Sequence, residues 1–230
     1  MILSIIIPVY NEEATIATII ERVLAVPFPA GFTKELVIVN DGSNDGTQEK
    51  LKAFSLNPQC RIFSLDKNQG KTAAVKLGLA QAAGDYIVMQ DADLEYDPSY
   101  YPSLLEPILQ GKADVVYGSR FQGTIQHMTF INRAANTISN LTINLLFHTR
   151  ITDFHTCLKM FKRQALQGID ITSHHFSFDT EITVKLLKKG YTIHEVPIQY
   201  KARSREEGKK INWRTAIESY FVLLKLALFK

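Results

Sequence analysis

Asp91 and Asp93 are the residues whose type and spacing best suit chemistry in this chain. They are separated by Ala92 and directly follow the apolar run at residues 86–89. Such a run is typical of a buried strand in an α/β sheet, and these sheets bind ligands beyond the carboxyl ends of their strands. Alternate residues of an extended strand point to opposite sides, so a turn must bring both carboxylates to one place. They would then offer the hard oxygen ligands with which Mg²⁺ or Mn²⁺ holds a diphosphate. The alternative is an acidic, solvent-exposed turn or a helix cap.

Three further polar segments are expected at the ends of strands. They are residues 8–12, 40–43 and 68–71, which read Pro-Val-Tyr-Asn-Glu, Asn-Asp-Gly-Ser and Asn-Gln-Gly-Lys. In a parallel sheet these loops emerge on the same edge as Asp91. Tyr10 could stack on a base, while Glu12 and Asp41 could accept hydrogen bonds from a base or a ribose. Lys71 could meet a phosphate. Each residue taken singly fits an ordinary turn or helix start, so the inference depends on their joint placement.

An alternation of strands and helices must position these loops. Strands are predicted at residues 3–8, 35–40, 61–65, 86–90 and 115–118, with helices that begin at Asn11, after the turn at 41–46 and at Gly70. This order favours an α/β fold with a mostly parallel sheet and helices on both faces. Beyond residue 120 the pattern predicts a long helix at 128–147, a shorter one at 178–189 and a strand at 192–200. Pro197 places that last strand at a sheet edge.

The composition is that of an ordinary globular protein. Of the 230 residues, 46% are hydrophobic and 21% are charged. We expect one domain at residues 1–211 and a C-terminal amphipathic helix at 212–230. The N-terminus lacks a basic leader and a cleavage site, and no apolar run approaches the length of a membrane span. Only two cysteines occur, Cys60 and Cys157, so disulfides are not expected and a cytoplasmic location fits.

The charges are unevenly distributed along the chain. Residues 1–184 carry 15 basic and 19 acidic side chains, whereas residues 185–230 carry 11 basic and 4 acidic ones. The basic end suggests an anionic partner, which could be nucleic acid, an anionic lipid surface or a phosphate. Nucleic acid is not expected, because no interleaved aromatic platform accompanies the charge. The final helix would lie on the cytoplasmic face of a membrane, or else pack on the domain or on a second subunit of a homo-oligomer.

Several motifs resemble those of glycosyltransferase family 2, and within it the dolichol- or polyprenyl-phosphate mannosyltransferase-like branch. They are residues 8–12, 39–47 and 190–198, together with Gly84-Asp85-Tyr86, Gln90-Asp91-Ala92-Asp93-Leu94-Glu95 and Gly118-Ser119-Arg120. The resemblance covers roughly residues 1–211 and implies a GT-A-type, Rossmann-like domain that binds a nucleotide-sugar. It also implies an inverting glycosyltransferase that uses Mg²⁺ or Mn²⁺. Such an enzyme would move a sugar from GDP-mannose or a UDP-hexose to a polyprenyl or dolichyl phosphate.

By position, the resemblance implies roles for individual residues. The nucleoside would be held by Pro8, Tyr10, Glu12, Val39 and Asp41. The sugar-diphosphate would be lined by Asp91 and Ala92, and the cation would be bound by Asp93 and Glu95 beside Asp91. Arg203 and Lys209 match an arginine and a lysine that close over the phosphates, with Arg205 and Lys210 as alternates. Arg120 would face the acceptor phosphate or the diphosphate, and Arg133 and Arg205 are the other candidates for the acceptor phosphate.

The acceptor region departs from the family pattern. The family usually has Asp-Pro-Thr-Ser-Gly-Phe where this chain has Asp153-Phe154-His155-Thr156-Cys157-Leu158, so the acceptor stays open. A lipid phosphate is largely dianionic at neutral pH because its second pKa is about 6, and it needs no strong base. A hydroxyl acceptor would need a carboxylate to take its proton, for which Asp153 is the candidate. The alternative for Asp153 is a helix or turn cap.

Two other functional classes share some of these features. Sugar nucleotidyltransferases have α/β order and acidic metal ligands, but they place a Gly-rich, Arg-containing loop where this chain has Val-Tyr-Asn-Glu at residues 9–12. A catalytically silent, membrane-docking scaffold is the non-enzymatic alternative. The presence of Asp91, Asp93 and Arg120 argues against it.

Overall fold

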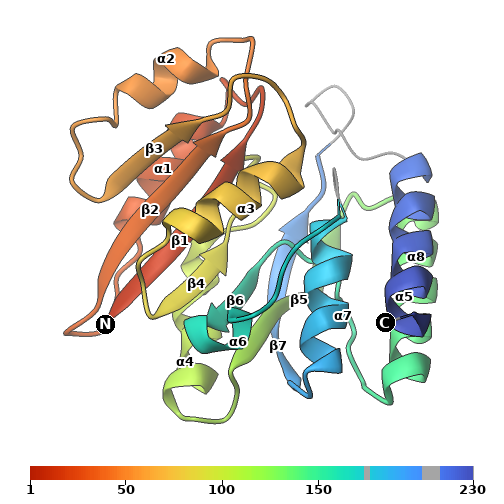
Figure 1. Cartoon of the computed structure of the whole chain (residues 1–230). Helices are drawn as coiled ribbons and strands as arrows, with labels where there is room; N and C mark the ends of the chain where they lie inside the picture. Colours follow the sequence, from red (N-terminus) through yellow and green to blue (C-terminus); the bar gives the residue numbers. More distant parts are fainter. Residues whose placement is uncertain (174–176, 204–212, 230) are drawn as a thin grey trace.

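A seven-stranded sheet runs through the computed structural model, which describes residues 1–173, 177–203 and 213–229, with the backbone alone at residues 213–217 (Figure 1). The strand order is β3-β2-β1-β4-β6-β5-β7. The strands are β1 (Ile2–Val9), β2 (Thr33–Asn40), β3 (Cys60–Ser64), β4 (Tyr86–Met89), β5 (Val115–Gln126), β6 (Lys159–Lys162) and β7 (Ile193–Lys201). All neighbouring pairs are parallel except those that involve β6. The predicted mostly parallel α/β fold is therefore confirmed.

The parallel half of the sheet is buried on both faces. Ile5, Ile6 and Ile7 of β1 point alternately to opposite sides, and none of the three has exposed surface. Continuous apolar sequence, instead of alternation, is the expected pattern when helices cover both faces. β1, β2 and β4 end at the same edge, because they are parallel and paired in register. The loops that follow them are thereby brought together.

The second half of the sheet contains a strand that the sequence did not indicate. β6 is only four residues long and has a lysine at each end, so it has no recognisable apolar run. It is antiparallel to β4 and β5 and closes the gap between them. β7 lies at the sheet edge, as Pro197 predicted.

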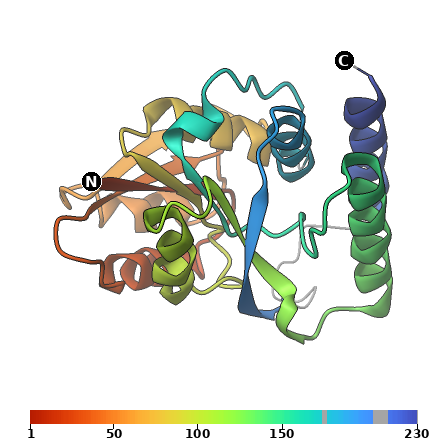
Figure 2. The same cartoon turned by 90° about the horizontal axis from the view of Figure 1, so that it is seen from below.

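Helices cover both faces of the sheet, as the view turned by 90° shows (Figure 2). They are α1 (Ile16–Ala25), α2 (Thr47–Lys52), α3 (Lys71–Gln81), α4 (Tyr101–Leu109), α5 (Phe130–Phe147), α6 (Arg163–Leu166), α7 (Phe178–Lys188) and α8 (Trp213–Leu228), with a 3₁₀ turn at Pro98–Tyr100. The first helix begins later than predicted. Its N-cap is Thr15, and Asn11 adopts a left-handed conformation in the preceding loop. Residue 212, at which the C-terminal helix was expected to begin, lies outside the described residues.

α5 and α8 lie side by side at one end of the molecule (Figures 1 and 2). α8 packs on α5 and α7, and its Leu223 is completely buried while Phe221 and Leu228 are exposed. The hydroxyl groups of Thr142 and Tyr220 lie 3.2 Å apart and join the two helices. None of the helices in the described ranges is both long and apolar enough to cross a membrane.

Candidate active site

The loops after β1, β2, β3 and β4 converge on a cavity of about 420 Å³, which is within the usual size of a small-ligand site. The same cavity extends to α5, α7 and α8. It is lined at one end by Pro8, Tyr10, Glu12, Asp41, Asn68 and Gly70, in the middle by Lys71, Asp91, Ala92, Asp93, Glu95 and Arg203, and at the other end by Asn132, Asn136, Ser139, His155, Asp179 and Ser219. The predicted convergence of the four loops is therefore found.

Asp41 is fixed at one end of the cavity by the loop that follows β3. Its two carboxylate oxygens accept hydrogen bonds of 2.8 Å from the backbone N–H groups of Gln69 and Gly70. Burial raises the pKa of Asp41, although these two hydrogen bonds oppose the rise. The two loops touch so closely that a Cβ atom at Gly42 would lie 2.5 Å from the backbone of Lys67, so only glycine fits there. The carboxylate is held in place and retains lone pairs for a ligand.

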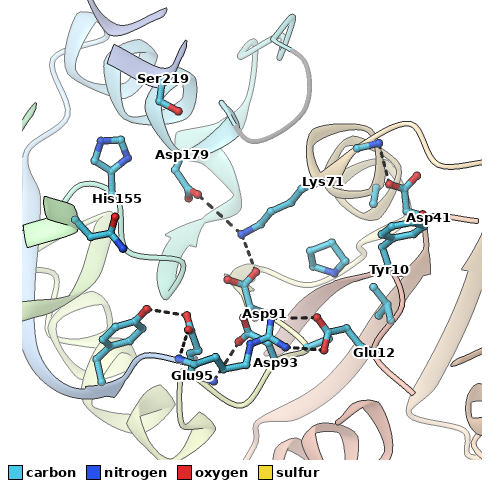
Figure 3. A pocket seen from close by; sticks show the side chains of 18 of the residues that line it. Tyr10, Glu12, Asp41, Lys71, Asp91, Asp93, Glu95, His155, Asp179 and Ser219 are labelled. Carbon is cyan, nitrogen blue, oxygen red and sulfur yellow. Dashed lines mark hydrogen bonds and ion pairs between the residues drawn. The ribbon is translucent and has the colours of Figure 1, made fainter. Parts of the chain in front are cut away.

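The turn required to gather the carboxylates of Asp91 and Asp93 occurs at Ala92 and Asp93, directly before Leu94, which has a φ of 63°. Asp93 accepts a hydrogen bond of 3.1 Å from the Glu95 N–H, so the side chain stabilises its own turn. Burial raises the pKa of Asp93 to about 7, and the neighbouring charges of Asp91 and Glu95 add to this effect. Figure 3 shows Asp91, Asp93 and Glu95 together at the cavity wall.

Two cationic side chains hold these acids. Lys71 Nζ lies 2.6 Å from Asp91 Oδ1 and 4.0 Å from Asp179 Oδ2 (Figure 3). Burial alone would lower the pKa of Lys71, but the charges of Asp91 and its neighbours raise it well above the ordinary value. Arg203 Nη2 lies 3.0 Å from Asp93 Oδ2. Lys71 therefore lies in the cavity as predicted, with its charge directed at Asp91.

The described residues contain no group of three or more His, Cys, Asp or Glu side chains arranged to hold a metal ion. The predicted set of Asp91, Asp93 and Glu95 is thus not assembled as a closed protein cage. The donor chemistry still fits a divalent cation of the Mg²⁺ kind, which is usually bound through one or two carboxylates and completed by substrate phosphates and water.

Arg120 and Asp153 form a buried ion pair next to the cavity. Arg120 Nε and Nη2 donate to Asp153 Oδ2 and Oδ1 at 2.7 and 2.8 Å. The backbone N–H of Arg120 also donates to Asp153 Oδ2, at 2.9 Å. Asp153 has no exposed surface, whereas Arg120 lines the cavity and lies 4.9 Å from the ring centre of Tyr200. This geometry argues against Asp153 as a base for a hydroxyl acceptor, because its oxygens are already occupied and cannot reach the cavity.

Several cavity residues were not anticipated from the sequence. Asn132, Asn136 and Ser139 recur at helical spacing and form one polar strip of α5 that faces the cavity. The amphipathic pattern of this helix contained that signal. His155 and Asp179 lie toward Ser219 of α8 (Figure 3). Burial lowers the pKa of His155 to about 4, so its imidazole is neutral at physiological pH.

Other predicted site residues lie away from the cavity. Val39 is completely buried in β2, and Arg133 is exposed on α5; neither lines the cavity. Arg205, Lys209 and Lys210 fall outside the described residues. Their predicted roles stay predictions.

Comparison with known proteins identifies relatives of this chain. A family model described as Glycosyl transferase family 2 matches residues 4–169. An undecaprenyl-phosphate 4-deoxy-4-formamido-L-arabinose transferase of Pectobacterium atrosepticum is 34% identical over 168 residues, which cover 72% of this chain and 50% of that protein. A dolichol-phosphate mannosyltransferase of Pyrococcus furiosus is 28% identical over 214 residues, which cover 91% of this chain and 59% of that protein. The chain thus spans between half and three-fifths of the length of these two relatives.

Solved structures share the fold at lower sequence identity. Glucosyl-3-phosphoglycerate synthase of Mycobacterium tuberculosis, in complex with Mn²⁺, UDP and glucosyl-3-phosphoglycerate, superimposes with a TM-score of 0.76 at 19% identity. The match covers 99% of this chain and 80% of that one. A complex of the same enzyme with Mg²⁺ and UDP gives a TM-score of 0.75.

Proposed function

Because the chain belongs to glycosyltransferase family 2, we propose that it transfers a sugar from a nucleotide-sugar to a polyprenyl-type lipid phosphate, with inversion at the anomeric carbon. One observation carries the proposal: a single cavity joins the carboxylate-rich ends of β1, β2 and β4 to the polar strip of α5. A donor and an acceptor can therefore meet inside it. The relatives named for undecaprenyl phosphate and dolichol phosphate support the acceptor class.

The donor would occupy the end of the cavity near Asp41. There Tyr10 and Pro8 offer apolar surface to a base, and Asp41 and Glu12 offer carboxylate oxygens to its N–H groups or to the ribose hydroxyls. Lys71 and Arg203 place positive charge in the middle of the cavity, where the diphosphate would lie. These residues bind and orient the leaving group before transfer.

Asp93 and Glu95, beside Asp91, would hold Mg²⁺ or Mn²⁺. When bound, the cation would neutralise charge that develops on the departing nucleoside diphosphate. The structural neighbour whose complexes contain UDP with Mn²⁺ or Mg²⁺ supports this use of a cation. In this structure Asp93 pairs with Arg203, and Glu95 accepts a hydrogen bond from Tyr200. A diphosphate would supply further oxygen ligands to the cation.

The acceptor phosphate would lie near Arg120 and the α5 strip. Asp153 acts here as a positioning residue, because it fixes the Arg120 guanidinium through two side-chain hydrogen bonds. A dianionic phosphate attacks without losing a proton, so this end of the cavity needs no general base. The neutral His155 and the amides of α5 offer hydrogen bonds without adding a competing charge.

The outer surfaces of α5 and α8 would face the membrane that carries this acceptor. Exposed apolar side chains cover both helices: Phe130, Ile131, Ile138, Leu141 and Leu145 on α5, and Phe221 and Leu228 on α8. The sequence of α5 contains no Asp or Glu, and Arg133 and Lys225 are exposed basic residues on the two helices. Apolar residues next to basic ones suit an anionic lipid surface. The polar faces of the same helices line the cavity, so the lipid headgroup has a short path into it.

A donor screen tests the proposed function. UDP- and GDP-sugars are incubated with the protein, Mn²⁺ and a short-chain polyprenyl phosphate, and release of the nucleoside diphosphate is measured. The expected result is release that requires the lipid phosphate and stops in EDTA. Undiminished release in EDTA, or no release from any donor, would refute the proposal.

A further inference from the structure

The guanidinium of Arg203 bridges two carboxylates that come from different loops. Nη1 and Nη2 donate to Glu12 at 3.0 and 3.2 Å, and Nη2 also donates to Asp93 at 3.0 Å. Glu12 and Asp93 follow β1 and β4, whereas Arg203 follows β7. The Arg203 guanidinium, from near the C-terminal end of the chain, therefore links the loops after β1 and β4 in the middle of the cavity.

The neighbouring acid is held by the same segment. Glu95 accepts a hydrogen bond of 2.6 Å from the Arg203 N–H and one of 2.7 Å from the Tyr200 hydroxyl. The chain at the end of β7 thus contacts Glu12, Asp93 and Glu95 at once, through the interactions that are dashed at these three residues in Figure 3. The side chains of Arg203 and Asp93 are each only 14% exposed, so little water screens their charges.

We propose that Arg203 pairs with the carboxylates of Glu12 and Asp93 before the donor binds and is displaced from them by the divalent cation and the nucleoside diphosphate. This inference rests on the proposed function, which assigns Glu12 to the nucleoside and Asp93 to the cation. Arg203 is then a positioning residue that holds Glu12 and Asp93 until the cation and the nucleoside diphosphate bind.

Charge explains why the guanidinium and the cation exclude each other. A divalent ion bound to Asp93 would lie about 2 Å from a carboxylate oxygen. Arg203 Nη2 lies 3.0 Å from such an oxygen, so the two positive charges would be close neighbours and repel each other. The exchange involves no covalent step. The diphosphate brings the negative charge that both the cation and the released guanidinium can then share.

The proposal predicts two effects of opposite sign for Arg203→Gln. Without nucleotide, Mn²⁺ alone should bind roughly three- to tenfold more tightly than to the wild-type protein, because a competing cation has been removed. With saturating Mn²⁺, UDP or GDP should bind at least about tenfold more weakly, because a charged partner of the diphosphate is missing. Free Mn²⁺ is measured by electron paramagnetic resonance, and nucleotide binding by calorimetry.

Arg61→Gln is the matched control. Arg61 also pairs with a carboxylate, at 3.1 Å from Glu35, but on β3 and outside the cavity. Its loss should leave the affinity for Mn²⁺ unchanged within about twofold. Arg203→Lys keeps the charge and loses the two-pronged geometry, so its affinity for Mn²⁺ should fall between those of the wild type and Arg203→Gln. Near-UV circular dichroism checks that each variant is folded.

Unchanged or weaker binding of Mn²⁺ to both Arg203 variants overturns the exchange, and so does the absence of measurable Mn²⁺ binding to either. A solely structural role would weaken both ligands, and a role in phosphate binding alone would leave the affinity for Mn²⁺ unaltered. The outcome is separable from that of the donor screen. Tighter Mn²⁺ binding without sugar transfer would sustain the exchange and reject the proposed function, and the reverse pattern would do the opposite.

Discussion

The carboxylate of Asp153 has no exposed surface, and both of its oxygens accept hydrogen bonds from the guanidinium of Arg120, which lines the cavity. This pair connects β5 to the loop before β6. Asp153, which the sequence suggested as a base, holds the guanidinium of Arg120 in this structure.

Asp153→Ala should destabilise the protein by about 3–5 kcal/mol, because it leaves the buried Arg120 charge without its partner. Urea unfolding measures the change. Glu49→Gln is the control, since Glu49 pairs with Lys52 at 2.8 Å on the surface with both side chains mostly exposed. That pair should contribute less than about 1 kcal/mol. An equal loss of unfolding free energy in the two variants would contradict a stabilising role of the buried pair.

Asp153→Asn tests whether Asp153 positions Arg120 or acts as a base. Loss of the charge should raise the KM for the lipid phosphate about tenfold and leave the shape of the pH profile unchanged, because no proton transfer is lost. A base would behave differently: its removal would abolish the acidic limb of the profile and lower kcat instead. Initial rates from pH 5 to pH 9 separate these outcomes.

Asp93→Ala should abolish sugar transfer and the Mn²⁺-dependent binding of nucleoside diphosphate while the fold stays intact, because the hard-cation site loses a charged ligand. Product formation measures the transfer, calorimetry the binding and circular dichroism the fold. Glu21→Gln removes an exposed carboxylate on α1 that does not line the cavity, and it should change none of the three. An active Asp93→Ala variant would show that Asp93 is not required for the cation.

His155 should make stability depend on pH. Burial lowers its pKa to about 4, below its ordinary value of 6.5, so the unfolded chain binds the proton more readily than the folded one. The stability due to the neutral imidazole is therefore complete above about pH 6.5 and is lost as the pH falls toward 4. The loss should be on the order of 1–3 kcal/mol.

Thermal unfolding of His155→Gln measures this contribution. The variant should lose less stability than the wild type between pH 7 and pH 4.5, because glutamine does not titrate. His194→Gln, at an exposed position of β7, should follow the wild type. An equal loss of stability with falling pH in His155→Gln and the wild type would show that His155 does not cause this pH dependence.

Leu141→Asp should weaken binding to anionic vesicles about tenfold, because it replaces an apolar side chain that is 64% exposed on α5 with a negative charge. Leu56→Asp is the matched control: Leu56 is 94% exposed but follows α2, away from α5 and α8. Flotation with vesicles at low salt compares the variants. Point substitutions are preferable to removal of α8, because Leu223 is buried and Ser219 lines the cavity. Equal flotation of both variants would reject the membrane-facing surface.

The sequence predicted the parts of the site that depend on strand ends. Apolar runs locate β1, β2 and β4, and the residues that directly follow such strands must meet at one edge, so Glu12, Asp41 and Asp93 could be placed together. The pairing of Arg203 with Glu12 could not be predicted, because 191 residues separate them and no local pattern records the contact. The sequence did not predict β6, because this strand is buried by its place between β4 and β5 and not by an apolar sequence of its own. Its own composition, with Lys159 fully buried beside Asp179, gives no strand signal.

The product of the reaction shows whether a sugar is transferred to a lipid phosphate with inversion. Nuclear magnetic resonance of the product made from an α-linked nucleotide-sugar and a short-chain polyprenyl phosphate reports both the bond formed and the anomeric configuration. We expect a ³¹P signal of a phosphodiester and a β-linked sugar in the ¹H spectrum. An α-linked sugar, or a sugar attached elsewhere while the phosphate remains a monoester, would contradict this expectation.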